Sequence, residues 1–131
     1  MEGGCFCGAI RYRLDGPPNR TTHCHCIHCR RLGGAPFVTW VETTRSGFHV
    51  VSGTMAAVES RPGITRRFCA SCGTQITYEN ADTPGAVDVT ACSLDDPSLV
   101  VPGDHVWADR MLPWVKLADG LPRYRKSRKD G

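Results

Sequence analysis

Eight cysteines constrain the fold of this chain most strongly, because seven of them fall into three closely spaced groups. The groups are GCFCG at residues 4–8, CHCIHC at residues 24–29 and FCASC at residues 68–72. No apolar run approaches the roughly 18 residues of a membrane helix, and MEGGCFCGAI lacks the features of a signal peptide. We therefore expect a cytoplasmic location, where disulfides are rare and clustered cysteines more readily bind a metal.

The third group has the shape of a zinc knuckle. Cys69 and Cys72 flank a tight turn, and Gly73 can take the positive φ that points backbone amides at the sulfurs. The alternative is a redox C-x-x-C pair. No βαβ pattern surrounds these residues, as a thioredoxin-like site would require, so metal binding is the better interpretation.

A knuckle supplies only two ligands, and the first group offers the other two. Cys5 and Cys7 stand two residues apart, so in an extended segment their side chains point to the same face. A tetrahedral zinc with Zn–S bonds near 2.3 Å needs sulfurs roughly 3.8 Å apart, which such a pair can reach. We therefore predict a closed structural zinc site of four thiolates, formed by Cys5, Cys7, Cys69 and Cys72.

The middle group then holds three thiolates, from Cys24, Cys26 and Cys29, with no fourth cysteine beside them. A structural zinc fills all four positions with protein ligands, whereas a catalytic zinc keeps one open, so these residues predict a second, open site. The alternative is closure by a nearby histidine or the remaining cysteine, that is by His23, His25, His28 or Cys92. Two zinc ions per chain are expected, the second bound less firmly. His25 is a candidate acid–base group or hydrogen-bonding neighbour of the ligands.

The rest of the sequence predicts one mainly β domain over residues 1–131, with little helix and a basic tail at residues 123–131. Nine prolines and fourteen glycines divide the chain into short pieces. Alternating or β-branched segments predict strands at residues 9–14, 37–43, 48–53, 74–79 and 86–94. SLDDPSLV at residues 93–100 permits a helical turn. Cys92 would share a strand face with Asp88 and Thr90, and we leave its role open.

Several motifs together resemble the glutathione-dependent formaldehyde-activating enzyme family, which also includes centromere protein V. They are GGCFCGAIRY, CHCIHCRRLGGAPFV, FCASCGTQI, SLDDP and the late H-V-W, P-W and LADGLPRY, covering roughly residues 3–124. The resemblance implies a zinc fold in which two sheets lean together like a tent. It implies the same partition of the seven cysteines into a structural and a catalytic site. Cys92 stands where the family commonly has a small residue such as glycine.

The activity that the resemblance implies is a zinc-dependent carbon–sulfur lyase reaction, in which glutathione or a similar thiol adds to formaldehyde or another small aldehyde. An open three-thiolate zinc suits that chemistry, because it can lower the pKa of a bound thiol. Basic side chains beside the cysteines could meet the glutathione carboxylates, namely Arg30, Arg31, Arg66 and Arg67. The alternative is a non-catalytic zinc-stapled module that binds nucleic acid through the tail. Only Tyr124 offers a stacking aromatic there, so nucleic acid is not the expected partner.

Overall fold

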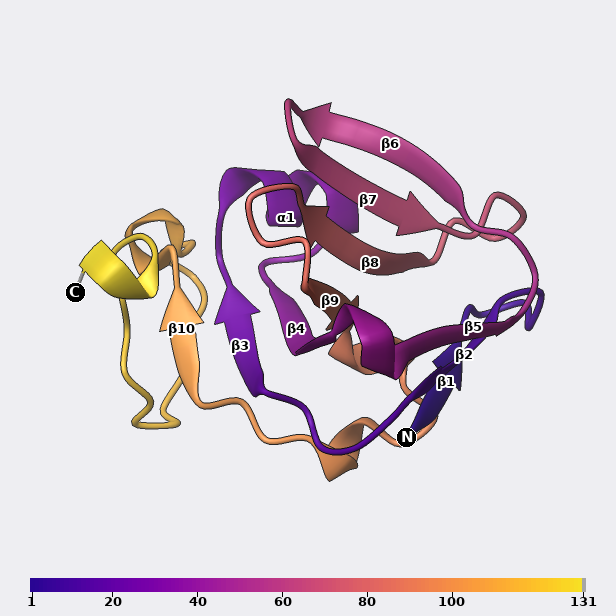
Figure 1. Cartoon of the computed structure of the whole chain (residues 1–131). Helices are drawn as coiled ribbons and strands as arrows, with labels where there is room; N and C mark the ends of the chain where they lie inside the picture. Colours follow the sequence, from indigo (N-terminus) through magenta and orange to yellow (C-terminus); the bar gives the residue numbers. More distant parts are fainter. Residues whose placement is uncertain (131) are drawn as a thin grey trace.

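A computed structural model, described here for residues 1–130, shows two β-sheets (Figure 1). The three-stranded sheet has the order β1 (Glu2–Gly4), β2 (Arg11–Leu14), β5 (Phe48–Ser52). The seven-stranded sheet has the order β10 (Asp104–Val106), β3 (Arg20–Cys24), β4 (Val38–Thr44), β9 (Ala86–Thr90), β8 (Gln75–Asn80), β7 (Ile64–Phe68), β6 (Ala56–Arg61). All neighbouring strands are antiparallel except β10 and β3, which are parallel. The predicted mainly β fold with two sheets is confirmed.

Helix is confined to short pieces. The α-helix α1 (Ile27–Gly33) lies between β3 and β4, and the 3-10 turns are η1 (Arg45–Gly47), η2 (Ala91–Ser93), η3 (Pro97–Leu99), η4 (Ala108–Arg110) and η5 (Arg128–Asp130). The predicted strand at residues 86–94 ends at Thr90, where η2 begins. Cys92 is therefore exposed in a turn, and the expected strand face shared with Asp88 was wrong. None of the helices in residues 1–130 is long and apolar enough to cross a membrane.

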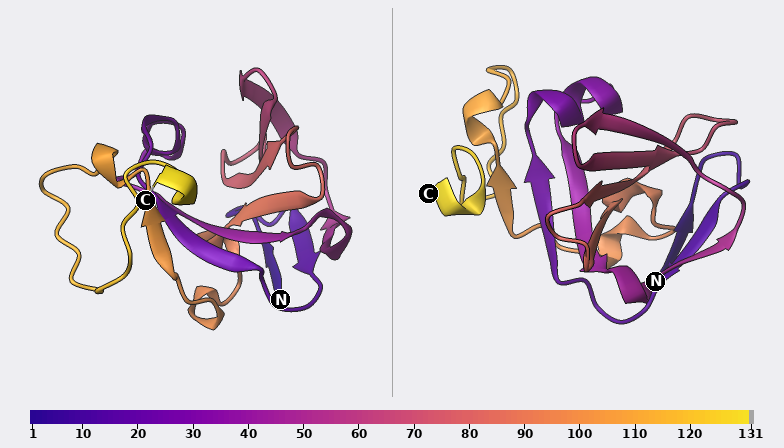
Figure 2. Two further views of the ribbon diagram at one scale, coloured as in Figure 1. Left: turned by 60° about the vertical axis from the view of Figure 1, so that its left-hand side comes forward. Right: turned by 45° about the horizontal axis from the view of Figure 1, so that its top comes forward.

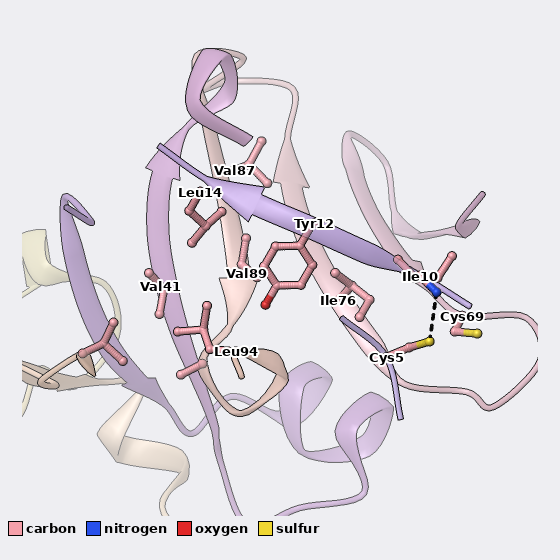
Figure 3. Close-up of a cluster of buried hydrophobic side chains, with 12 residues drawn as sticks. Cys5, Ile10, Tyr12, Leu14, Val41, Cys69, Ile76, Val87, Val89 and Leu94 are labelled. Atoms are coloured by element: carbon pink, nitrogen blue, oxygen red, sulfur yellow. Dashed lines mark hydrogen bonds between the residues drawn. The ribbon is translucent and has the colours of Figure 1, made fainter. Parts of the chain in front are cut away.

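The main hydrophobic core lies between the two sheets (Figure 3). In β2 the side chains alternate, so that Tyr12 and Leu14 are buried while Arg13 is exposed. Val87 and Val89 of β9 belong to the same core from the large sheet. This period of two is the expected pattern for a strand with one face on a core. Tyr12 is 1% exposed, and its hydroxyl forms a hydrogen bond with Ser93 Oγ at 2.7 Å, so this buried polar group has a partner.

The alternation of side chains along each strand also determines which residues lie on the face of the large sheet that points away from the core. Between Val87 and Val89, Asp88 points the other way, and Trp40 and Glu42 of β4 share that face beside Val41 of the core. Strands β6 and β7 rise on one side of this face and α1 on the other (Figure 2, left). The residues that line the pocket described below come from these elements.

Candidate metal centres and the adjoining pocket

The four predicted structural cysteines lie together, with all four sulfurs within 4.8 Å of one another. Cys5 Sγ is 3.6 Å from Cys7 Sγ, and Cys7 Sγ is 3.8 Å from Cys69 Sγ. A tetrahedral zinc with Zn–S bonds near 2.3 Å places its sulfurs about 3.8 Å apart, so these four sulfurs are a suitable donor set for zinc. The cluster links the β1–β2 connection to the β7–β8 connection, 62 residues further along the chain.

The two halves of this cluster are both tight turns closed by a glycine. Gly73 has a φ of 82°, as predicted for the knuckle, and its N–H donates to Cys69 O at 2.8 Å. Cys5 and Cys7 lie in a turn as well, since Gly8, with a φ of 82°, donates its N–H to Cys5 O at 3.2 Å. The extended segment that we expected for Cys5 and Cys7 was therefore wrong. The turn brings the sulfurs together instead, and the Ile10 N–H donates to Cys5 Sγ at 3.2 Å.

The second cluster gathers Cys24, Cys26 and Cys29, whose sulfurs also lie within 4.8 Å of one another. Cys24 ends β3, Cys26 is the N-cap of α1 and Cys29 lies in the first turn of that helix. Cys26 Sγ accepts the Cys29 N–H at 3.3 Å, so one ligand also caps the helix. Among the side chains of residues 1–129 no fourth cysteine, histidine or carboxylate joins the group at that distance.

The three thiols of this cluster share their protons unequally. Hydrogen bonds with Cys24 and Cys29 hold the pKa of the Cys26 thiol far below its usual value, and the same contact with Cys26 raises the pKa of Cys24. A group that readily carries one negative charge on clustered sulfurs is a suitable donor set for a soft divalent cation.

Arg66 and Trp40 both donate to a sulfur of this cluster. The two terminal nitrogens of Arg66 lie 3.8 and 3.7 Å from Cys29 Sγ, and Trp40 Nε1 lies 3.4 Å from it. Arg66 is 4% exposed and stacks on the Tyr78 ring at 5.1 Å. Sequence reasoning placed Arg66 near the substrate carboxylates, whereas the structure places its guanidinium against sulfur. Trp40 was missed, because only the pairing of β4 with β3 shows that it reaches the cluster.

The other predicted basic residues lie elsewhere. Arg67 points away from Arg66 on the same strand and forms an ion pair with Glu79, Nε to Oε1 at 2.9 Å. Arg30 and Arg31 do not line the pocket beside the cysteines but a separate groove with Trp114. The Nε of Arg30 is buried and makes no hydrogen bond.

A pocket of about 390 Å³ opens directly on Cys24, Cys26 and Cys29. Its walls combine aromatic rings, two carboxylates and several cations, namely Trp40, Tyr78, Trp107, Glu42, Asp88, Arg20, Arg61, Arg66, Arg110 and Arg128. Clefts of this size that combine apolar walls with a few charged groups are typical of small-molecule sites. Trp107 adopts the left-handed conformation, with a φ of 55°, which turns the chain at the pocket edge.

Asp88 is a titratable pocket residue that sequence reasoning missed as a functional candidate. Burial, followed by the nearby charge of Glu42, raises the pKa of its carboxyl to about 7. Glu42 faces it across the β4–β9 pair and Tyr78 across the β8–β9 pair, while Arg20 and Arg128 lower the pKa from the open side. Asp88 is therefore a pocket carboxyl that exchanges its proton near neutral pH.

The basic tail contributes a wall of the pocket. Trp107 donates its N–H to Lys126 O at 2.8 Å, and Arg128 forms an ion pair with Asp104, Nε to Oδ2 at 2.6 Å. Figure 1 shows this last segment folded back beside β10. Arg128 thereby reaches the pocket, so this part of the tail is folded against the domain.

His25 lies behind the cluster and is not part of the pocket lining. Its ring is fully buried, and Nε2 hydrogen bonds with His105 Nδ1 at 2.9 Å. Burial, followed by the neighbouring charge of His105, lowers the pKa of His25 to about 4, so it is neutral at physiological pH.

Known proteins are similar to this chain in sequence and in fold. The protein of Halomonas elongata named "Putative glutathione-dependent formaldehyde-activating enzyme" is 27% identical over 127 residues, covering 89% of this chain and 80% of that protein. A crystal structure of a Rhodobacter sphaeroides protein is similar with a TM-score of 0.61 at 21% identity, covering 94% of this chain and 99% of the other. The sequence model described as "Glutathione-dependent formaldehyde-activating enzyme" matches residues 1–110. This chain therefore belongs to the glutathione-dependent formaldehyde-activating enzyme family.

Proposed function

We propose that this chain adds glutathione, or a similar small thiol, to formaldehyde or another small aldehyde, as a carbon–sulfur lyase. One observation carries the proposal: three clustered cysteines without a fourth ligand in residues 1–130 open directly on the pocket. A closed structural site would instead be filled by protein. Membership of the family supports the choice of glutathione and formaldehyde.

The cysteine cluster fits zinc as its donor set, and a zinc ion held by Cys24, Cys26 and Cys29 would supply an open position at which a thiol loses its proton more easily. The protein adds a compensating charge. Three thiolates and Zn²⁺ sum to −1, and the buried Arg66 guanidinium beside Cys29 brings the local charge close to zero. The site is then less repulsive to a further thiolate.

In the reaction itself, the thiolate sulfur forms a bond to the carbonyl carbon while the carbon–oxygen π bond breaks. The aldehyde oxygen then takes one proton, so that the proton lost by the thiol is regained in the hydroxymethyl product. Asp88 is a pocket carboxyl that can hold a proton at neutral pH. We assign it this role.

Recognition of the thiol is assigned to cations of the pocket that have no carboxylate partner. Arg20 pairs with Glu42 at 3.4 Å, and Arg128 is paired with Asp104. Arg110 lines the same pocket and forms no ion pair with the side chains of residues 1–129. Glutathione is a net anion at neutral pH, so we propose that Arg110 binds one of its carboxylates.

Isothermal titration of the zinc-loaded protein with glutathione tests the proposal. We expect Cys29→Ser to abolish binding and Arg110→Ala to weaken it about five- to tenfold, the usual loss for one charge-assisted contact. Arg31→Ala is the matched control, because Arg31 lies outside the pocket, and its affinity should equal that of the wild type. No heat with the wild type, or equal loss in both arginine variants, would contradict the assignment.

The pKa of Asp88 also predicts how stability changes with pH. A carboxyl whose pKa is raised in the folded state binds its proton more tightly there than in the unfolded chain. Folding stability contributed by this group is therefore lost as the pH rises from about 4 to about 7. Asp88→Asn removes this cost, so the variant should gain up to about 2 kcal/mol over the wild type between pH 5.5 and pH 8.

Urea unfolding at the two pH values measures this gain. Comparing each variant with the wild type at the same pH removes the pH dependence of metal binding that all the proteins share. Asp82→Asn changes the same group on an exposed turn and serves as the control. If both variants follow the pH dependence of the wild type, the pocket carboxyl titrates at its ordinary pKa and the assignment of its proton role is lost.

A further inference from the structure

A third group of side chains of the types that bind metals lies behind the pocket, on the opposite face of β3. Thr22 and Cys24 line the pocket, so His23 between them points away from it. The parallel pairing of β10 with β3 sets His105 directly opposite His23, and the two ring centroids are 4.9 Å apart. The group therefore follows from the register of the two strands.

The loop after β10 adds a carboxylate to the two rings. Asp119 Oδ2 is 2.8 Å from His105 Nε2, and its other oxygen accepts the Leu121 N–H at 3.1 Å, which fixes the carboxylate. The chain then returns to β10, where the His105 N–H donates to Pro122 O at 2.9 Å. These two backbone hydrogen bonds hold the Asp119 carboxylate next to the His105 ring.

The geometry points to a third metal site, formed by His23, His105 and Asp119, that takes a divalent transition ion such as Zn²⁺, Co²⁺ or Ni²⁺. One ligand atom from each residue lies within 4.8 Å of the others. Two ligands of one ion at about 2.1 Å are about 3.0–3.4 Å apart, so the His105–Asp119 contact of 2.8 Å needs to widen only slightly. Two imidazoles and one carboxylate are a common set for such ions.

The Nδ1 atoms of His23 and His105, which would not bind the ion, each have a hydrogen-bond partner, as is usual for histidine ligands of metals. His23 Nδ1 is 2.8 Å from Thr39 Oγ1, and His105 Nδ1 is 2.9 Å from His25 Nε2. A histidine that binds a metal through one nitrogen almost always hydrogen bonds through the other, which fixes its orientation. Both ligand histidines have such a partner.

An ion on His105 Nε2 would leave His105 Nδ1 hydrogen-bonded to His25 Nε2, the contact that it makes at 2.9 Å. The other ring nitrogen of His25, Nδ1, is buried without a hydrogen-bond partner, so a proton placed there is costly. Arg30 and Arg123 add repulsive charge. We therefore expect weaker binding than at the cysteines.

Titration with Co²⁺ tests the site in tag-free protein that carries two Zn²⁺ per chain, so that the tighter cysteine clusters are filled and the histidine group is still empty. We expect one further Co²⁺ per chain without the intense thiolate-to-cobalt absorption of sulfur ligands, together with shifted ring resonances of His23 and His105. Asp119→Asn keeps a hydrogen-bonding group of the same shape but removes the charge, and His23→Gln removes one ring. Each should weaken this binding by at least about tenfold.

Asp109→Asn is the control, since Asp109 is exposed on the nearby η4 and belongs to no candidate metal group in residues 1–130. Thermal melting shows first that each variant is folded. No further Co²⁺, binding with a thiolate band, or equal binding by Asp119→Asn and Asp109→Asn would overturn the site. The group would then be only a hydrogen-bond network that joins the loop to β10.

Discussion

Replacing Cys69 by serine is expected to unfold the chain under conditions in which the wild type is folded, with a loss of more than about 4 kcal/mol in the free energy of unfolding. Cys69 is 2% exposed and belongs to the main core as well as to the four-cysteine cluster. Its loss removes one ligand of a metal whose binding free energy is also folding free energy. Urea and thermal unfolding, with metal content measured in parallel, test this.

The matched control is Cys92→Ser, the same chemical change at an exposed cysteine outside both clusters. It should melt with the wild type. A strong chelator added to the wild type should reproduce the effect of Cys69→Ser, because both remove the same cross-link between distant turns. Equal stability of Cys69→Ser and Cys92→Ser would show that the four cysteines do not stabilise the fold through a metal.

The strands that could be predicted from the sequence are those whose own residues show a clear strand pattern. β2, β4, β5, β8 and β9 were each predicted within a few residues, because their apolar or aromatic side chains recur with a period of two or form β-branched runs. β1, β3, β6, β7 and β10 were missed. β3 reads RTTHC and β6 reads AAVESR, so neither shows a continuous apolar face. They are strands because of their neighbours in the sheet.

The candidate site also has features that could be predicted from the sequence and features that could not. The partition of the cysteines depends on local spacing, and local spacing is what a sequence displays. The contacts of Arg66 and Asp88 depend on which strands become neighbours, since β7 pairs with β8 and β9 pairs with β4. Nothing in the sequence around Arg66 or Asp88 distinguishes these residues from other arginines and aspartates of the chain. The role of the tail was hidden for the same reason, because Arg128 reaches the pocket only when its segment folds back on β10.

Replacing Cys26 by serine is expected to leave the fold intact while it removes the second metal. Cys26 is the N-cap of α1, and serine is a preferred N-cap residue that can accept the Cys29 N–H as the sulfur does. The free energy of unfolding should therefore change by less than about 1 kcal/mol. Zinc content should fall from about two to about one per chain, because one of three protein ligands is lost at a site open to solvent.

Cys26→Ala separates the two roles of this residue. Alanine loses the same ligand but cannot cap the helix, so it should match Cys26→Ser in zinc content while it unfolds about 1 kcal/mol more easily. Graded chelation of the wild type should release the same ion first, since the open site makes one bond fewer to protein. Release of both ions together, or loss of both from Cys26→Ser, would mean that the two clusters are not independent. Two ions retained in Cys26→Ser would mean that the open cluster is not a metal site, and the thiol chemistry proposed for the pocket would lose its basis.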